Sequence, residues 1–575
     1  MGVYHFFSWF RKNFYSTIDN IKDNQTLEDV GIPIDNLLID MNGIFHNSAQ
    51  KIYEYGSFKR NIRFLKCKKY NKTHIDVYKN VCESIEELFN IVKPKKKLIM
   101  AVDGPAPSCK MYQQRQRRYK NVMSREEDDT SFDGNCISPG TKFMDNLTRY
   151  IDWYIKKRMS EDPEWQKIEI IFSNANSPGE GESKLFNYVR KFGDKNESYL
   201  LHGSDADLIM LALTTHIEKF YILREDISYN KKENDKFLLV DIGKTSLQLT
   251  TILSWGESEN FIYDPNTAIN DFVFLCFMMG NDFIPHIPGL EIIEGGIDTI
   301  LSVYRDIGKF NGHITKLSHD NKIYFNKIPL KIFFQLISEY EKPVLEHKLK
   351  NKKIYFEDKL LESCAVFKDN SYELDIDKYR KEYCKEYFGS NKNNVLEKVC
   401  NSYLEGLQFV ITYYTQGVPN WNWNYNCHYA PSTYILSKYI DSFIFKTYVK
   451  DIPLLPFQQL MYILPPKSFN LLPHPLDLAF QDESLTEIYP EKIEIDLAGK
   501  KNDYQGIALL PFVDIEIIKK FHNEKIKLVN IKEASRNKHG RTFIYNFMSH
   551  YTGETKKLYY GDIPNYKIRA YLIDI

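Results

Sequence analysis

Seven acidic side chains stand at the ends of short apolar runs or in the loops beside them. They are Asp40, Asp103, Glu180, Glu182, Asp205, Asp207 and Asp282. A single Asp after a strand is usually a helix cap or a turn residue. Here acidic residues recur at five separate places, and the carboxyl ends of parallel strands meet at one edge of a sheet. The seven groups can therefore converge at that edge.

Carboxylates that share one cavity repel one another strongly unless cations neutralise them. Ligand sets made only of oxygen select Mg²⁺ or Mn²⁺ over Zn²⁺. Two such ions, about 3.5–4 Å apart, recur in enzymes that cleave phosphodiester bonds, where one activates water and the other stabilises the leaving oxygen. The acidic set therefore indicates metal-dependent phosphoryl chemistry, and we expect two ions.

A basic segment at 110–120 follows Asp103 closely. If it is helical, one face carries Lys110, Gln114, Arg117 and Arg118. A basic run is most often a solvated surface helix, but this one has no acidic partners four residues away to relieve its repulsion. Arginine forks and a lysine ammonium group suit a terminal phosphate. We therefore expect a phosphate site beside the acidic one.

The elements that would position these groups follow from the hydrophobic pattern of roughly the first 310 residues. Apolar runs of strand length occur at 37–39, 98–102, 168–172 and 238–240, and residues 77–92 have helical spacing. This alternation predicts an α/β unit with a mainly parallel sheet flanked by helices. We expect residues 1–310 to form the core that carries both sites.

The remaining chain is predicted to form a second region, mostly helical and loop-rich, wrapped around that core. Residues 311–400 are rich in Lys, Asp, Glu and Tyr and are expected to be helical connecting material. Residues 401–515 should form a second core region that closes the active site, and their prolines favour loops over long helices. The sequence indicates no role for residues 516–575.

The composition excludes several classes of protein. The 575 residues include 76 basic and 76 acidic side chains, so the chain is not a wholly basic nucleic-acid coat protein. The nine scattered cysteines lack zinc-site spacing and fit a reducing, cytosol-like compartment. The apolar runs are far below the ~18 residues that cross a bilayer. The N-terminus lacks the features of a secretory signal, so we expect a soluble intracellular protein without a membrane partner.

Several ordered segments resemble the 5′-to-3′ exoribonucleases of the XRN type. They include LLIDMNGIFHN, AVDGPAPSCKMYQQRQRRY, SPGEGESKL, GSDADLIMLAL and DFVFLCFMMGNDFIPHIP, and later GVPNWNWNYNCHYAPS and EIDLAGKKNDYQGIALLPFVD. No single string is decisive, but the ordered set is highly specific. It covers both core regions, and the chain looks like a compact member of this family.

The resemblance implies a core like that of PIN-type and flap nucleases, with processive, metal-dependent hydrolysis of 5′-monophosphorylated RNA to nucleoside 5′-monophosphates. It implies that the seven carboxylates bind the metal ions and that the four residues of the basic helix bind the 5′-monophosphate. It also implies that the 5′-terminal base is clamped between His46 and a tryptophan, which is Trp421 or Trp423. Such stacking is worth roughly 1–3 kcal/mol per base and tolerates any sequence.

Two other functions compete with this interpretation. A structure-specific flap-type DNA endonuclease has similarly arranged carboxylates, but the later tryptophan-rich segment and the basic helix argue against it. A catalytically inactive RNA-binding scaffold is disfavoured because clustered carboxylates would repel RNA unless metals neutralised them.

The expected cellular setting also follows from the resemblance. We expect a monomer that takes part in mRNA decay in the cytoplasm, with single-stranded RNA as its substrate and the decapping machinery as a partner. The high content of Lys, Asn, Ile, Tyr and Phe suits an AT-rich genome. If that genome is viral, the location would be the host cytoplasm or the virion.

Overall fold

The computed structural model describes residues 5–22, 25–58, 72–123, 132–225, 235–319, 322–368, 371–449 and 451–575. Within these ranges the largest sheet has nine strands in the order β1-β7-β6-β5-β2-β3-β4-β14-β17. Its central strands all run parallel: β6 (Phe220–Glu225), β5 (Tyr199–His202), β2 (Asn36–Asp40), β3 (Lys97–Ala101) and β4 (Glu169–Ser173). The predicted α/β unit with a mainly parallel sheet is confirmed.

Both edges of this sheet are antiparallel. At one edge β7 (Asp235–Asp241) pairs with β6 and with β1 (Ile18–Lys22), so the run predicted at 238–240 is a strand outside the parallel set. At the other edge β14 (Thr542–Phe547) pairs with β4 and with β17 (Ile568–Ile573). The segment 516–575, for which the sequence indicated no role, therefore extends the sheet.

The parallel strands are buried on both faces because alternate side chains enter two apolar layers. Leu37 and Ile39 of β2 lie in one layer, whereas Leu38 lies in the other. The first layer includes α2 (Met41–Tyr53), α3 (His74–Val92) and α5 (Lys142–Glu161). The second includes α7 (Gly181–Phe192), α8 (Asp207–Leu213), α10 (Pro265–Cys276) and α15 (Asn393–Gln416). The helix predicted at 77–92 is α3.

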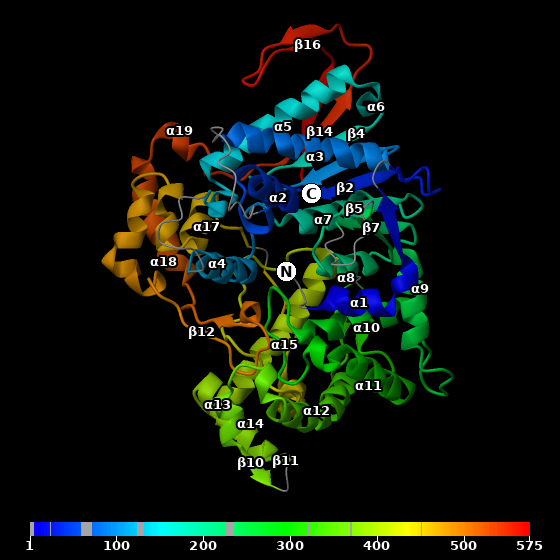
Figure 1. Ribbon diagram of the computed structural model, residues 1–575, viewed down its shortest axis with the longest axis vertical. Coiled ribbons are helices and arrows are strands. Elements are labelled where there is room, and N and C mark those ends of the chain that lie inside the picture. The colour runs from blue at the N-terminus through cyan, green and yellow to red at the C-terminus, as the bar shows by residue number, and fades with distance from the viewer. Residues whose placement is uncertain are drawn as a thin grey trace, which may run out of the picture.

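A helical region forms the lower end of the molecule in Figure 1, below the sheet. Its main helices are α11 (Gly296–Asn311), α12 (Lys327–Lys350) and α14 (Ile376–Phe388), followed by α15. Two hairpins interrupt it, β8–β9 (Thr315–Leu317 and Ile323–Phe325) and β10–β11 (Ala365–Lys368 and Ser371–Leu374). Helix α15 runs through position 400, so the domain boundary expected there falls inside a helix.

A third apolar cluster joins the basic helix to the loop-rich part of the chain. Helix α4 (Ser108–Met123) packs on α17 (Pro456–Ile463), which in turn packs on α18 (Ile515–Lys525). Arg115 is fully buried there and donates to the backbone carbonyls of Tyr462 and Ile488. This packing buries one face of α4 against the loop-rich part of the chain. Across the described ranges, no helix is both long and apolar enough to cross a membrane.

Candidate active site

A cavity of about 190 Å³ lies at the carboxyl ends of the parallel strands. Most of the residues predicted for the two sites line it together. They are Asp40, His46, Asp103, Lys110, Gln114, Arg117, Glu180, Glu182, Asp205 and Asp282. Six of the seven predicted carboxylates and three of the four residues of the basic set thus share one space, and Asp207, which is not in this lining, lies beside Glu182 and Asp205. The chemical roles of these residues stay predictions.

Backbone and amide groups hold the two carboxylates that follow β2 and β3. Asp40 ends β2 and caps α2, where it accepts from the Asn42 backbone N–H at 3.4 Å. The carboxylate of Asp103 accepts from Asn42 Nδ2 and from the Gly181 backbone N–H, each at 2.7 Å. A Cβ atom on Gly181 would lie 2.7 Å from Asp40 Oδ1, so this position at the start of α7 needs glycine. These hydrogen bonds hold the carboxyl ends of β2 and β3 close to the start of α7.

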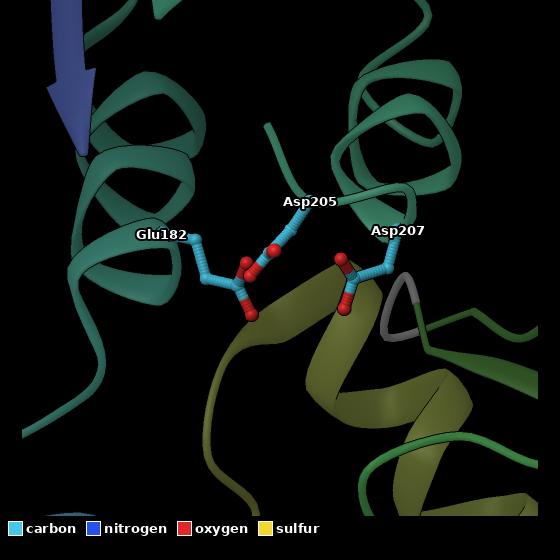
Figure 2. Close-up of side chains that lie close together, drawn as sticks. All are labelled: Glu182, Asp205 and Asp207. Atoms are coloured by element: carbon cyan, nitrogen blue, oxygen red, sulfur yellow. The ribbon is translucent and has the colours of Figure 1, made fainter. Parts of the chain in front are cut away.

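Three further carboxylates converge from α7, from the loop after β5 and from α8. Oxygen atoms of Glu182, Asp205 and Asp207 all lie within 4.8 Å of one another, and their carboxylates point toward one another in Figure 2. Asp207 Oδ1 is buried and has no hydrogen-bond partner among the residues that the structure describes. Leaving an anionic oxygen unsatisfied is costly, and three converging carboxylates are the ligand type of Mg²⁺ and Mn²⁺. The residues present fit a divalent cation.

Burial dominates the electrostatics of the acidic set. Burial and the neighbouring Asp103 hold the pKa of Asp40 well above its usual value. Burial and the charge of Asp207 likewise raise the pKa of Glu182. Burial, followed by the repulsion of Asp205, raises the pKa of Asp207 to about 7. A bound cation would offset these costs because it favours the ionised carboxylates.

Lys110 lies among the carboxylates as well as on the face of α4 that is predicted to bind phosphate. Its Nζ forms ion pairs with Glu180 and, at 2.7 Å, with Asp282. Burial acts to raise the pKa of Asp282, but Lys110, together with other nearby positive charges including Arg117, outweighs it, and the pKa lies below its usual value. Gln114 and Arg117 follow along the same face and line the same cavity. The predicted phosphate site is thus continuous with the acidic site.

Arg118 differs from the other three residues of the basic set. It is buried and, over the described chain, is not part of the cavity lining. Its guanidinium donates to Ser138 Oγ at 2.7 Å and to the Gln114 carbonyl at 3.4 Å. Burial and the neighbouring Arg117 lower the pKa of Arg118 to about 9. Its direct contact with a phosphate stays a prediction.

Of the residues predicted to clamp the first base, His46 lies in the cavity lining. Burial with the charges of Arg117 and Arg118 lowers its pKa to about 3, so its ring is neutral at physiological pH. Neither Trp421 nor Trp423 belongs to the cavity lining in the part of the chain that is described.

The tryptophan segment instead docks on the start of α4. The carbonyls of Trp421 and Trp423 accept from the backbone N–H groups of Ser108 and Cys109, at 2.8 and 3.2 Å. The Trp423 ring stacks on Phe409 of α15 with centroids 4.3 Å apart. The choice between the two tryptophans therefore stays open.

Sequence reasoning missed three residues that support this site. Asn42 bridges Asp40 and Asp103, and Lys184 donates to the carbonyls of Val102 (2.6 Å) and Asn174 (3.0 Å). Burial lowers the pKa of Lys184 to about 7. The Tyr413 hydroxyl donates to Glu180 Oε2 at 2.5 Å. Asn42 and Lys184 belong to the quoted segments LLIDMNGIFHN and SPGEGESKL, whereas no local signal marks Tyr413.

A larger cavity of about 220 Å³ lies on another face of α4. Cys109, Gln113, Gln116 and Lys120 contribute to its wall, and Asp282 lines both cavities. Size alone would favour this larger space as a binding site. The smaller cavity is the better candidate because the converging carboxylates and the basic helix meet there.

An acidic cavity beside a basic helix, at the carboxyl edge of a parallel sheet, is the arrangement expected of a nuclease that cleaves phosphodiester bonds. The family described as XRN 5′-3′ exonuclease N-terminus matches residues 1–226, and the Xrn1 helical domain matches residues 262–373 and 367–569. The chain belongs to the XRN family of 5′-3′ exonucleases.

Curated relatives are similar in sequence to this chain over most of its length. The 5′-3′ exoribonuclease 2 homolog of Drosophila melanogaster is 30% identical over 96% of this chain and 74% of its own length. The 5′-3′ exoribonuclease 2 of Gallus gallus is 29% identical over 95% of this chain and 72% of its own length. The 5′-3′ exoribonuclease 1 of Schizosaccharomyces pombe is 28% identical over 96% of this chain, which spans 50% of that relative.

Proposed function

We propose that this protein is a 5′-to-3′ exoribonuclease that removes nucleoside 5′-monophosphates processively from single-stranded, 5′-monophosphorylated RNA. One observation carries the proposal: Lys110, Gln114 and Arg117 line the same cavity as the carboxylates. A phosphate held on α4 would keep the first nucleotide beside the acidic set. The names of the relatives, 5′-3′ exoribonuclease 1 and 2, support the direction of cleavage and RNA as the substrate.

Glu182, Asp205 and Asp207 would hold Mg²⁺ or Mn²⁺. The further predicted ligands line the cavity beside them and are Asp40, Asp103, Glu180 and Asp282. We expect two ions, which would supply water activation and stabilisation of the leaving oxygen. The chain's own groups orient the substrate: Arg117 and Gln114 bind the 5′-phosphate, and the neutral ring of His46 offers a face for the first base.

Selection of the RNA end would follow from the small volume around the basic face of α4. A 5′-monophosphate gains charge-assisted hydrogen bonds, each worth about 1.5–3 kcal/mol. A 5′-triphosphate or a cap adds bulk that a closed cavity excludes. A 5′-hydroxyl end fits but cannot form those hydrogen bonds. Monophosphorylated RNA would therefore be degraded fastest.

The position of the label in the first product tests the direction and mode of cleavage. With 5′-³²P-labelled RNA, we expect a labelled mononucleotide as the first product and no labelled oligonucleotide. A flap DNA substrate, run in parallel, should stay intact. Release of labelled oligonucleotides, or preferential cutting of the flap, would instead support the flap-type endonuclease.

The cellular setting is proposed on the family resemblance alone. We propose that the protein acts as a monomer in mRNA decay in the cytoplasm and receives monophosphorylated RNA from the decapping machinery. A viral source would place it in the host cytoplasm or the virion.

A further inference from the structure

One buried tyrosine of the second region reaches into the acidic site. Tyr413 lies near the end of α15 and is 1% exposed. Its hydroxyl donates to Glu180 Oε2 at 2.5 Å, within the short range of a hydrogen bond to a carboxylate. Glu180 is itself only 2% exposed. The contact joins two segments 233 residues apart in the sequence.

The two oxygens of Glu180 have different partners. Oε2 accepts from Tyr413, whereas Oε1 pairs with Lys110. The tyrosine ring is held in turn by Phe283, at a centroid distance of 4.8 Å, and by Phe409, stacked at 6.4 Å. Because the ring is packed on these neighbours, the hydroxyl has little freedom to move. The carboxylate it bonds is therefore held in one orientation.

We propose that Tyr413 is a positioning residue that orients Glu180 for metal binding, so that helix α15 completes the metal centre of the nuclease core. This inference rests on the proposed function. Partners of metal-binding carboxylates fix ligand orientation, and their loss typically lowers metal affinity or activity by about 10–100-fold. Tyr413 itself touches neither substrate nor metal in this assignment.

The same helix face also supports the substrate side of the site. Phe409 lies one turn before Tyr413 and stacks on Trp423, in the segment docked on the start of α4. Phe283 follows Asp282, the carboxylate paired with Lys110. One face of α15 thus contacts the tryptophan segment, the Asp282 loop and Glu180. This arrangement gives a physical reason to expect that catalysis needs the second region.

Tyr413→Phe tests the proposal because it removes only the hydroxyl. Mn²⁺ affinity is measured without RNA, from the free-ion signal in electron paramagnetic resonance. We expect the variant to bind Mn²⁺ about 10–100-fold more weakly and to lose kcat by a similar factor. Its affinity for 5′-monophosphorylated RNA in EDTA should stay within about twofold, because the phosphate site on α4 is unchanged.

Tyr383→Phe is the matched control. This tyrosine is also buried, on α14, and its hydroxyl donates to a backbone carbonyl, that of Ala430, at 3.0 Å. The control should keep the Mn²⁺ affinity of the unmodified protein. Equal losses in both variants would mean that any buried hydroxyl matters, and would overturn the positioning role.

A double-mutant cycle with Glu180→Gln decides whether Tyr413 acts through Glu180. If it does, adding Tyr413→Phe to Glu180→Gln should weaken Mn²⁺ binding no further. Additive losses, or unchanged Mn²⁺ affinity in the single Tyr413→Phe variant, would overturn the inference. An unmodified protein that binds Mn²⁺ but does not degrade RNA would instead overturn the proposed function.

Discussion

Asp207 illustrates at the residue scale how a functional site opposes stability. Burial and Asp205 raise its pKa from 3.8 to about 7. Between these values the folded state holds a proton that the unfolded chain has released, so stability falls as the pH rises through this window. At one pKa unit per 1.36 kcal/mol, the cost above pH 7 is on the order of a few kcal/mol.

Asp207→Asn should therefore stabilise the metal-free protein. At pH 8 the cost of ionising the buried Asp207 carboxyl is complete, so we expect the variant to have a higher Tm than the unmodified protein. At pH 4 this cost is absent, and we expect little difference in Tm. Thermal unfolding in EDTA at both pH values is the measurement. A Tm gain of the same size at pH 4 and pH 8 would contradict this electrostatic explanation.

Loss of a carboxylate from the converging trio should abolish cleavage. Asp205→Ala or Asp207→Ala removes a predicted ligand of the ion that would activate water and neutralise the developing charge. Loss of that ion costs orders of magnitude in rate. Both variants should remain folded and keep much of their RNA affinity. Residual activity within tenfold of the unmodified enzyme would contradict the metal assignment.

The two neighbouring arginines should behave differently on substitution. Arg117→Ala should narrow the rate difference between monophosphate and hydroxyl ends with little change in Tm, because Arg117 lines the cavity. Arg118→Ala should narrow the same difference, mainly by slowing cleavage of the monophosphate end, and also lower Tm, since its buried bond to Ser138 is lost. Paired rate and melting measurements test this, and an unchanged Tm for Arg118→Ala would contradict its structural role.

At the scale of the elements, position 181 at the start of α7 cannot carry a side chain unless a neighbouring group shifts. Gly181→Ala would place a Cβ 2.7 Å from Asp40 Oδ1 and 3.1 Å from the Ala101 carbonyl. Asp40 would have to move, and so would the amide bonded to Asp103. We expect kcat to fall at least about tenfold, since misplaced catalytic groups cost this much or more. An unchanged kcat would show that the close approach is not required.

Truncation after residue 400 cuts α15 inside a continuous helix. The fragment would lose Tyr413, the buried residues Leu404 and Leu407, and β14, which pairs with β4. We expect an inactive and poorly folded protein, although all seven carboxylates remain. Circular dichroism, limited proteolysis and an RNA degradation assay measure this. A fully active 1–400 fragment would contradict the dependence of the site on the second region.

At the scale of the whole molecule, local sequence patterns predicted three of the five parallel strands, β2, β3 and β4, but not β5 and β6. These three strands are short, almost wholly apolar and bounded by turn residues, so their periodicity is visible without tertiary information. The edge strands of the sheet were harder to predict. Strand β14 pairs with β4, which lies more than half of the chain away in sequence, and β14 lies in a lysine-rich stretch. The predicted domain boundary at position 400 falls inside α15 because the composition changes there while the helix continues.

The same distinction applies to the candidate site. The carboxylates could be found because strand ends place them at one edge, and α4 because its basic face is a local pattern. The burial of Arg118 and the bond from Tyr413 to Glu180 depend on how α4 and α15 pack against other elements. Those contacts are long-range, and no local spacing in the sequence indicates them.

The central claim is that one cavity combines metal-dependent cleavage with recognition of a 5′-monophosphate. Its most direct test is degradation of one RNA carrying a 5′-monophosphate, a 5′-hydroxyl, a 5′-triphosphate or a cap, each with Mg²⁺ and with EDTA. We predict rapid degradation of the monophosphate form, slow degradation of the hydroxyl form, resistance of the other two, and no degradation in EDTA. Equal rates on monophosphate and triphosphate ends, or undiminished activity in EDTA, would contradict the claim.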